Sequence, residues 1–162
     1  MNVLVCAACG RRLSEPLRLL PELSERPEYD GLKNPDGSRH APSTVRRGTY
    51  AVDPEPCGAP YAPHPDPESY EFRSATDSYL LNGEILVSAG PRDTLVVHPE
   101  DTLGHLVHNP ASAEFGCCGA PGREGPNQVC DGCGAVVATR FSECYGRYET
   151  HFLPDAVQVA AV

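Results

Sequence analysis

The chain has 162 residues, which suits one domain, and its 17 prolines and 15 glycines require a large share of turns and loops. The net charge of −9 arises in residues 48–116, where eleven acidic residues face only Arg73 and Arg92. Leu, Ile, Val and Phe number 33 and Trp is absent, so the apolar core is small. No apolar run approaches the ~18 residues of a membrane helix, and recurrent prolines exclude a long coiled coil.

The first half of the chain predicts short strands and long loops. A strand over residues 2–5 runs directly into a cysteine motif, and a second strand is expected over 48–52. Residues 14–29 contain several leucines, but three prolines limit them to a turn of helix at most. Residues 53–67 contain six prolines, so we expect an extended, polyproline-like loop there.

The second half predicts most of the β-structure. Residues 84–89 and 94–98 are apolar runs joined by Gly-Pro-Arg-Asp, which indicates a hairpin. Further strands are expected over these ranges: 103–108, 135–141, 145–152 and 155–161. The predicted fold class is therefore mainly β.

The chemistry is concentrated in two Cys-x-x-Cys-Gly motifs near opposite ends of the chain, Cys6 to Gly10 and Cys130 to Gly134. Two cysteines three positions apart across a tight turn aim both sulfurs at one point, and the glycine lets the backbone turn back. Two such knuckles supply the four thiolates of a tetrahedral Zn²⁺ site. The predicted metal ligands are Cys6, Cys9, Cys130 and Cys133, and the closed coordination sphere favours a structural, non-catalytic ion.

These knuckles, each beside a predicted strand, resemble a zinc ribbon. Ribbons usually hold their knuckles closer together, whereas 120 residues lie between Cys9 and Cys130 here. The resemblance implies one domain over 1–162, with a ribbon-like base from 1–13 plus 128–162 and an acidic, proline-rich β insert over 48–116. Twelve Arg against one Lys indicate GC-rich codons, and the chain is similar to uncharacterised small zinc-ribbon proteins of high-GC bacteria.

Other uses of the knuckle cysteines remain open at this point. A lone Cys-x-x-Cys can be a thioredoxin-like redox pair, although neither motif here heads a helix in a βαβ unit. A local metal set of Cys118, Cys130, Cys133 and Cys144 is a second alternative. It would leave Cys6 and Cys9 to pair with Cys57 or Cys117.

The remaining cysteines are candidates for a second zinc site. Its candidate ligands are Cys57, Cys117 or Cys118, Cys144 and one of the histidines His98, His105 and His108. Adjacent cysteines point to opposite sides of an extended chain, so we expect only one of Cys117 and Cys118 to bind the zinc ion. The other cysteine would then be an incidental neighbour with no part in metal binding. A vicinal disulfide or a reactive thiol is the alternative for this pair. His105 and His108 would not share a face of a strand, so ordinary histidines are expected there.

The sequence contains none of the common phosphate-loop, metalloprotease or hydrolase motifs. Together with the acidic middle segment, which repels phosphate, this predicts a non-catalytic zinc protein that serves as a protein-interaction or regulatory module and binds another protein with a basic surface. The alternatives are an enzyme with an open second metal site, or a nucleic-acid-binding ribbon that uses Arg11, Arg12, Arg140 and Arg147. Eight cysteines without signal-peptide features predict a reducing, cytoplasmic location.

Overall fold

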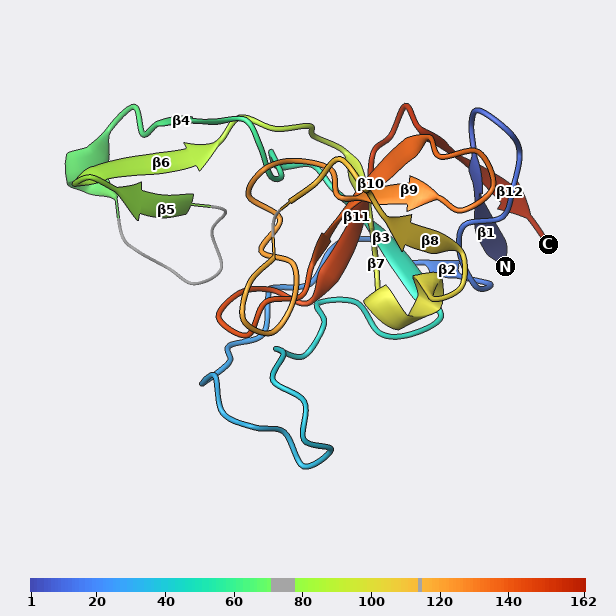
Figure 1. Cartoon of the computed structure of the whole chain (residues 1–162), viewed down its shortest axis with the longest axis horizontal. Helices are drawn as coiled ribbons and strands as arrows, with labels where there is room; N and C mark the ends of the chain where they lie inside the picture. The colour runs from blue at the N-terminus through green and yellow to red at the C-terminus, as the bar shows by residue number, and fades with distance from the viewer. Residues whose placement is uncertain (71–77, 114) are drawn as a thin grey trace.

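The computed structural model describes residues 1–70, 78–113 and 115–162 (Figure 1). Residues 71–77 and 114, which belong to the predicted acidic insert and include Arg73, lie outside the described residues. The fold is mainly β, as predicted, and the described ranges contain three sheets and two short 3₁₀ helices, η1 (Pro67–Ser69) and η2 (Pro99–Thr102). No helix in these ranges is long and apolar enough to cross a membrane.

A seven-stranded sheet forms the main body of the molecule. Its strands occur in the order β2-β3-β7-β11-β10-β9-β8, and neighbours are antiparallel except for the parallel pair β2–β3. The predicted base and the predicted insert share this one sheet, because the base strands β11, β10 and β9 lie between the insert strands β3 and β7 on one side and β8 on the other. The bounds of the strands are β2 (Arg18–Leu19), β3 (Thr49–Asp53), β7 (Thr94–Val97), β8 (Leu106–His108), β9 (Gln128–Cys130), β10 (Val136–Phe141) and β11 (Glu149–Phe152).

The two ends of the chain pair with each other in a separate two-stranded sheet. Strand β1 (Asn2–Cys6) runs antiparallel to β12 (Val157–Ala161), and Cys6 lies opposite Val157. The N and C termini therefore lie side by side (Figure 1). This pairing places the first knuckle, which directly follows β1, against the main body of the fold.

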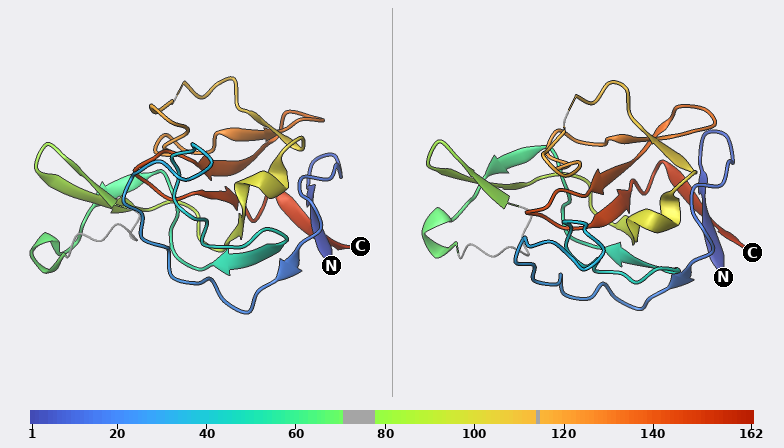
Figure 2. Two further views of the ribbon diagram at one scale, coloured as in Figure 1. Left: turned by 90° about the horizontal axis from the view of Figure 1, so that it is seen from below. Right: turned by 60° about the horizontal axis from the view of Figure 1, so that its bottom comes forward.

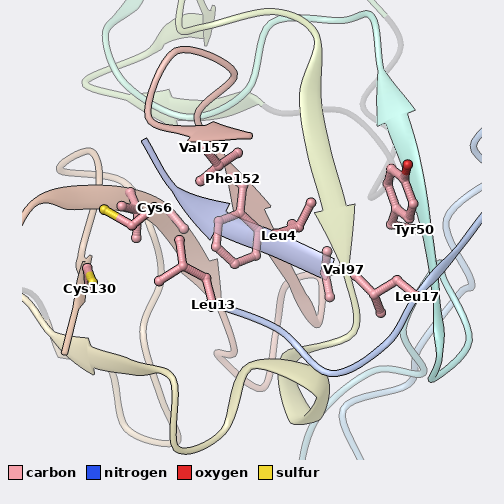
Figure 3. Close-up of a cluster of buried hydrophobic side chains, with 11 residues drawn as sticks. Leu4, Cys6, Leu13, Leu17, Tyr50, Val97, Cys130, Phe152 and Val157 are labelled. Carbon is pink, nitrogen blue, oxygen red and sulfur yellow. The ribbon is translucent and has the colours of Figure 1, made fainter. Parts of the chain in front are cut away.

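The apolar core joins the two-stranded sheet to the seven-stranded sheet. Alternate residues of β1 point inward, so Leu4 and Cys6 pack in the same buried cluster as Val97 of β7 and Phe152 of β11 (Figure 3). Cys130 lies at the same end of this cluster as Cys6. The complete cluster contains Leu4, Cys6, Leu13, Leu17, Tyr50, Val97, Cys130, Val137, Ala138, Phe152 and Val157.

The predicted hairpin of 84–89 with 94–98 is wrong. Strand β6 (Glu84–Ser88) pairs with β4 (Tyr61–Pro63) and β5 (Ser78–Leu81) in a three-stranded sheet, which we call the arm, whereas β7 joins the seven-stranded sheet. The arm extends away from the main body in every view (Figures 1 and 2).

Two local features explain this divergence. Gly90 lies so close to the backbone of residues 57–59 that no Cβ would fit, and the Cys57 N–H donates to the Pro91 carbonyl, so the connecting residues are held by another segment. The hairpin forms instead between β5 and β6. Its two-residue turn is Asn82-Gly83, with φ of 50° and 78°, the residue pair that such tight turns favour.

Most of the other predicted strands form, some of them shorter than expected. Strands β3, β10 and β12 correspond to the predictions. Strand β8 covers only 106–108 of the predicted strand 103–108, and β11 covers only 149–152 of the predicted strand 145–152. The proline-rich stretch is loop apart from β4 and part of η1, and β4 lies at the edge of the arm, where proline is tolerated. Residues 14–29 contain no helix.

Candidate metal centre

The two Cys-x-x-Cys-Gly motifs adopt the same local structure. In the first, the Cys6 N–H donates to the Arg11 carbonyl at 2.8 Å, and the Gly10 N–H returns to the Cys6 carbonyl at 2.8 Å. In the second, Cys130 and Gly134 make the equivalent bonds at 2.9 Å. The closing glycines have φ of 74° and 75°, the left-handed conformation that favours glycine. The predicted knuckle geometry therefore arises twice from the same short sequence.

The structure brings all four predicted ligands together. Their sulfurs lie within 4.8 Å of one another, and two pairs that cross between the knuckles, Cys6 with Cys133 and Cys9 with Cys130, are each 3.7 Å apart. Two sulfurs bound at ~2.3 Å to one tetrahedral zinc lie about 3.8 Å apart. The cluster thus has the spacing of a tetrahedral four-thiolate site, and we call it the ribbon site.

The ribbon site is half buried. Cys6 and Cys130, the first cysteine of each knuckle, are each 1% exposed and belong to the core cluster, whereas Cys9 and Cys133 are exposed. Burial raises the pKa of Cys6, but hydrogen bonds to its sulfur from the backbone N–H groups of Cys9 and Ala8 and from the Cys133 and Cys9 thiols together lower it by more, so the net pKa lies below the ordinary value. The backbone N–H of Arg11 lowers the pKa of Cys9, but burial and the other three sulfurs raise it to about 12.

Contacts outside the cysteines hold the two knuckles in register. The Arg11 guanidinium forms an ion pair with Asp131, with Nε 2.6 Å from Oδ1, and this pair links residues 120 positions apart. Gly132 lies beneath the Arg11 side chain, because a Cβ there would be 2.5 Å from the Arg11 Cδ. The glycine at the third position of the second knuckle is thus explained by close approach of the first knuckle.

A second cluster contains three of the remaining cysteines. Sulfurs of Cys117, Cys118 and Cys144, with one carboxylate oxygen of Glu143, lie within 4.8 Å of one another, and we call this group the loop cluster. The sulfurs of both Cys117 and Cys118 lie in this group, so the expectation that the two side chains point to opposite sides is wrong. The chain bends at 117–119 rather than extending, and this bend places the two sulfurs 3.5 Å apart on one side.

Several alternative ligand sets are also wrong. The local set fails because Cys130 and Cys133 join the first knuckle, whereas Cys118 and Cys144 lie in the loop cluster. Cys57 belongs to neither cluster and adjoins His151 instead. All eight cysteines are free thiols in the structure, so no vicinal disulfide forms between Cys117 and Cys118.

The three candidate histidines do not join either cluster. His98 accepts the Glu100 N–H at 3.2 Å at the start of η2, and burial lowers its pKa despite the nearby acids. His105 contacts Glu15 at 3.1 Å. His108 contacts the carbonyl of Ser112 at 3.0 Å.

A buried ionic network was not anticipated from the sequence. His151 Nε2 lies 2.6 Å from Glu149 Oε2, and His151 Nδ1 lies 2.9 Å from the Thr94 hydroxyl. Burial alone would lower the pKa of His151, but Cys57 and Glu149 raise it to about 9. Burial alone would raise the pKa of Glu149, but the contacts with His151 and the nearby arginines outweigh this effect and lower the pKa to about 2. The detectable signal was the i, i+2 spacing of Glu149 and His151, which places both on one face of a strand.

Both ring nitrogens of His151 have a partner, the Thr94 hydroxyl at Nδ1 and Glu149 at Nε2, and the Cys57 thiol contacts the same ring. Glu149 also forms part of the wall of a cavity of about 520 Å³ between the main body and the arm, beside Arg26 and Arg147. The network is best described as a buried ion pair that supports this wall.

Comparison with protein-family models, curated proteins and solved structures found no match to this chain. Its function is therefore inferred from the two cysteine clusters and from the charge distribution of the chain itself.

Proposed function

We propose that this protein is a non-catalytic zinc-binding protein in which one Zn²⁺ at the ribbon site joins the two ends of the chain, and that it acts as a protein-interaction module. The observation that carries the proposal is the convergence of four free thiols, with all sulfurs within 4.8 Å of one another and two pairs at 3.7 Å: Cys6, Cys9, Cys130 and Cys133. Four thiolates in tetrahedral spacing are the ligand set of structural zinc.

The choice of zinc over other metals follows from the ligands. Thiolates are soft donors, and tetrahedral sets of four sulfurs select zinc or iron–sulfur chemistry. The short Cys-x-x-Cys-Gly turns, with backbone N–H groups directed at sulfur, suit a single small ion. Free thiols held for metal binding also support the proposed reducing, cytoplasmic location.

The structural role follows from what the site connects. The first knuckle extends from the two-stranded sheet and the second from the β9–β10 hairpin of the seven-stranded sheet, so one ion would cross-link these two sheets. Binding of structural zinc supplies about 10 kcal/mol or more of apparent folding free energy. That exceeds the net stability of many small domains, and the core cluster here is small.

The interaction role is supported by charge and shape. Residues 48–116 carry the net negative charge of the chain, and the arm at their centre exposes Leu80 and Leu81, with Glu84 opposite Leu81. Asp66 and Glu68 are exposed in the connection between β4 and β5. We therefore propose a protein partner with a basic surface.

The four arginines considered for nucleic-acid binding are otherwise engaged. Arg11 pairs with Asp131 and Arg12 pairs with Glu15. Arg147 is 6% exposed and packs over the Phe141 ring at 3.7 Å, and Arg140 is partly buried. They do not form a free basic surface, which favours the protein partner over nucleic acid.

The metal proposal is tested by zinc content per chain and by thermal unfolding of protein purified under reducing conditions without a histidine tag. Wild type is expected to contain zinc at the ribbon site, and Cys6→Ser or Cys130→Ser is expected to lose that ion together with the folded state. Cys57→Ser, the one cysteine outside both clusters, is the matched control and should retain the metal. Full zinc content in Cys6→Ser and Cys130→Ser would contradict the proposal.

The partner proposal is tested by affinity capture with a charge-neutralised arm. The variant combines Asp66→Asn, Glu68→Gln and Glu84→Gln, and it should lose partners that wild type retains at low salt. A matched control neutralises three exposed acids elsewhere, Glu25→Gln, Glu28→Gln and Asp155→Asn, and should retain them. Partners that resist high salt and are indifferent to both variants would argue against the acidic arm as the binding surface.

A further inference from the structure

We propose that the loop cluster is a second zinc site, with Cys117, Cys118 and Cys144 as thiolate ligands and Glu143 Oε1 as the fourth ligand. This site goes beyond the structural zinc of the ribbon site and does not depend on it. Binding would displace three thiol protons, and Zn²⁺ with three thiolates and one carboxylate carries a net charge of −2.

The first support is the ligand spacing. Cys117 Sγ lies 3.5 Å from the sulfurs of both Cys118 and Cys144, close to the edge of about 3.8 Å expected between thiolates of a tetrahedral zinc. Glu143 Oε1 lies 3.3 Å from Cys117 Sγ. Bond lengths of ~2.3 Å to sulfur and ~2.0 Å to oxygen give a sulfur–oxygen edge of about 3.5 Å.

The second support is the state of Glu143 itself. Its side chain is 2% exposed, its Oε2 has no hydrogen-bond partner, and no ion pair of Glu143 occurs among the described residues. A buried carboxylate without a cation is costly, and a metal ion at its other oxygen would offset that cost. Oε1 already accepts the N–H groups of Cys118 and Cys144, at 3.0 and 2.9 Å, so the carboxylate is held with that oxygen towards the sulfurs.

The third support is that the backbone is built for this close approach. The pair Cys117-Cys118 lies between Gly116 and Gly119, and a Cβ on the first would overlap the Glu143 carboxylate, whereas one on the second would overlap the backbone of Ser142. Hydrogen bonds between Ala120 and Ser142, at 2.8 and 3.0 Å, fasten this loop to the end of β10. The two segments that carry the ligands are therefore positioned before any metal arrives.

The surrounding charge complements an anionic complex. Cys118 lines a cavity of about 390 Å³ together with Lys33, Arg39 and Arg140. Three cationic side chains at one side of the cluster would partly balance the net negative charge of the proposed site. Cys117 and Cys118 are exposed, in contrast to the buried inner cysteines of the ribbon site, so we expect the loop cluster to exchange its metal faster.

The test is metal stoichiometry with Zn²⁺ and Co²⁺ as the probes, on full-length reduced protein. Wild type should bind two metal ions, and the triple variant Cys117→Ser, Cys118→Ser, Cys144→Ser should bind one. Because the ribbon site assembles only when both chain ends are in place, the ion retained there reports that the variant is folded. Cobalt charge-transfer absorption should fall by the contribution of three thiolates.

A second variant separates ligand loss from misfolding. Glu143→Gln keeps the shape and an oxygen that can accept the two backbone N–H groups, and it should weaken the second metal by at least about 10-fold while leaving the first unchanged. One metal in both wild type and the triple variant would overturn this proposal and leave the ribbon site standing. One metal that the triple variant loses would instead support the loop cluster and overturn the ribbon site.

Discussion

Leu4 is expected to control how tightly the ribbon site holds its metal, although its side chain is not a ligand. It is fully buried on β1, two residues before Cys6, and packs in the cluster that joins the two-stranded sheet to the seven-stranded sheet (Figure 3). Because the two knuckles belong to different sheets, opening this apolar interface would separate the two halves of the site.

The expected magnitude follows from burial. Leu→Ala at a fully buried site lowers the free energy of unfolding by about 2–5 kcal/mol, because the transfer free energy of the removed atoms is lost and a cavity remains in their place. A cost of about 3 kcal/mol raises the population of the opened state about 100-fold. If metal escapes through that opened state, Leu4→Ala should release zinc about 100-fold faster.

The assay is the rate of zinc transfer to an excess of a chromophoric chelator, measured together with the free energy of unfolding in urea. Leu80→Ala is the matched control, because Leu80 is 63% exposed on the arm and should change neither quantity appreciably. A wild-type rate of zinc release in Leu4→Ala, despite the expected loss of stability, would refute this coupling between core and metal.

Three further outcomes are expected. The pKa of His151 is about 9 in the folded protein against an ordinary value of 6.5, so the stability that His151 contributes is complete below pH 6.5 and is lost between pH 6.5 and 9. The pKa of Glu149 is about 2 against an ordinary value of 4.5, so the stability that Glu149 contributes is present above pH 4.5 and is lost towards pH 2. The free energy of unfolding, measured in urea at a series of pH values, should therefore fall less steeply above pH 6.5 in His151→Gln than in wild type. Gly122→Ala should cost about 2–4 kcal/mol, because φ is +73° and the new Cβ would overlap the Phe141 ring, whereas Gly146→Ala, with open space around it, should cost little. Removing metal from wild type with a strong chelator at neutral pH should lower the thermal midpoint followed by circular dichroism, and an unchanged midpoint would count against a structural ion.

The four cysteines of the ribbon site could be selected from the sequence because the signal is local. A Cys-x-x-Cys-Gly segment forms its turn from its own backbone hydrogen bonds, so Cys6 and Cys130 start equivalent knuckles wherever the rest of the chain lies. The pairing of one knuckle with the other was decided by long-range contacts, namely the β1–β12 sheet and the ion pair of Arg11 with Asp131. Spacing alone left the local cysteine set open.

The loop cluster could not be assembled from sequence spacing. Adjacent Cys117 and Cys118 were expected to diverge because an extended backbone alternates its side chains. The flanking glycines were the available signal that the chain bends and approaches another segment closely, and that segment, with Glu143, is 25 residues away. The failed hairpin between 84–89 and 94–98 has the same origin, because residues 57–59 hold the connecting segment.

The sequence by itself determined the mainly β character, the acidic middle segment and the two cysteine knuckles of the ribbon site, since composition, charge and short motifs act within a few residues. Only the tertiary structure decided that strands of base and insert share one sheet, that both ends of the chain meet, and that Glu143 and His151 are buried among particular partners. The physical reason is that strand pairing and burial are set by contacts between residues far apart in the chain, and such contacts leave no fixed spacing in the sequence.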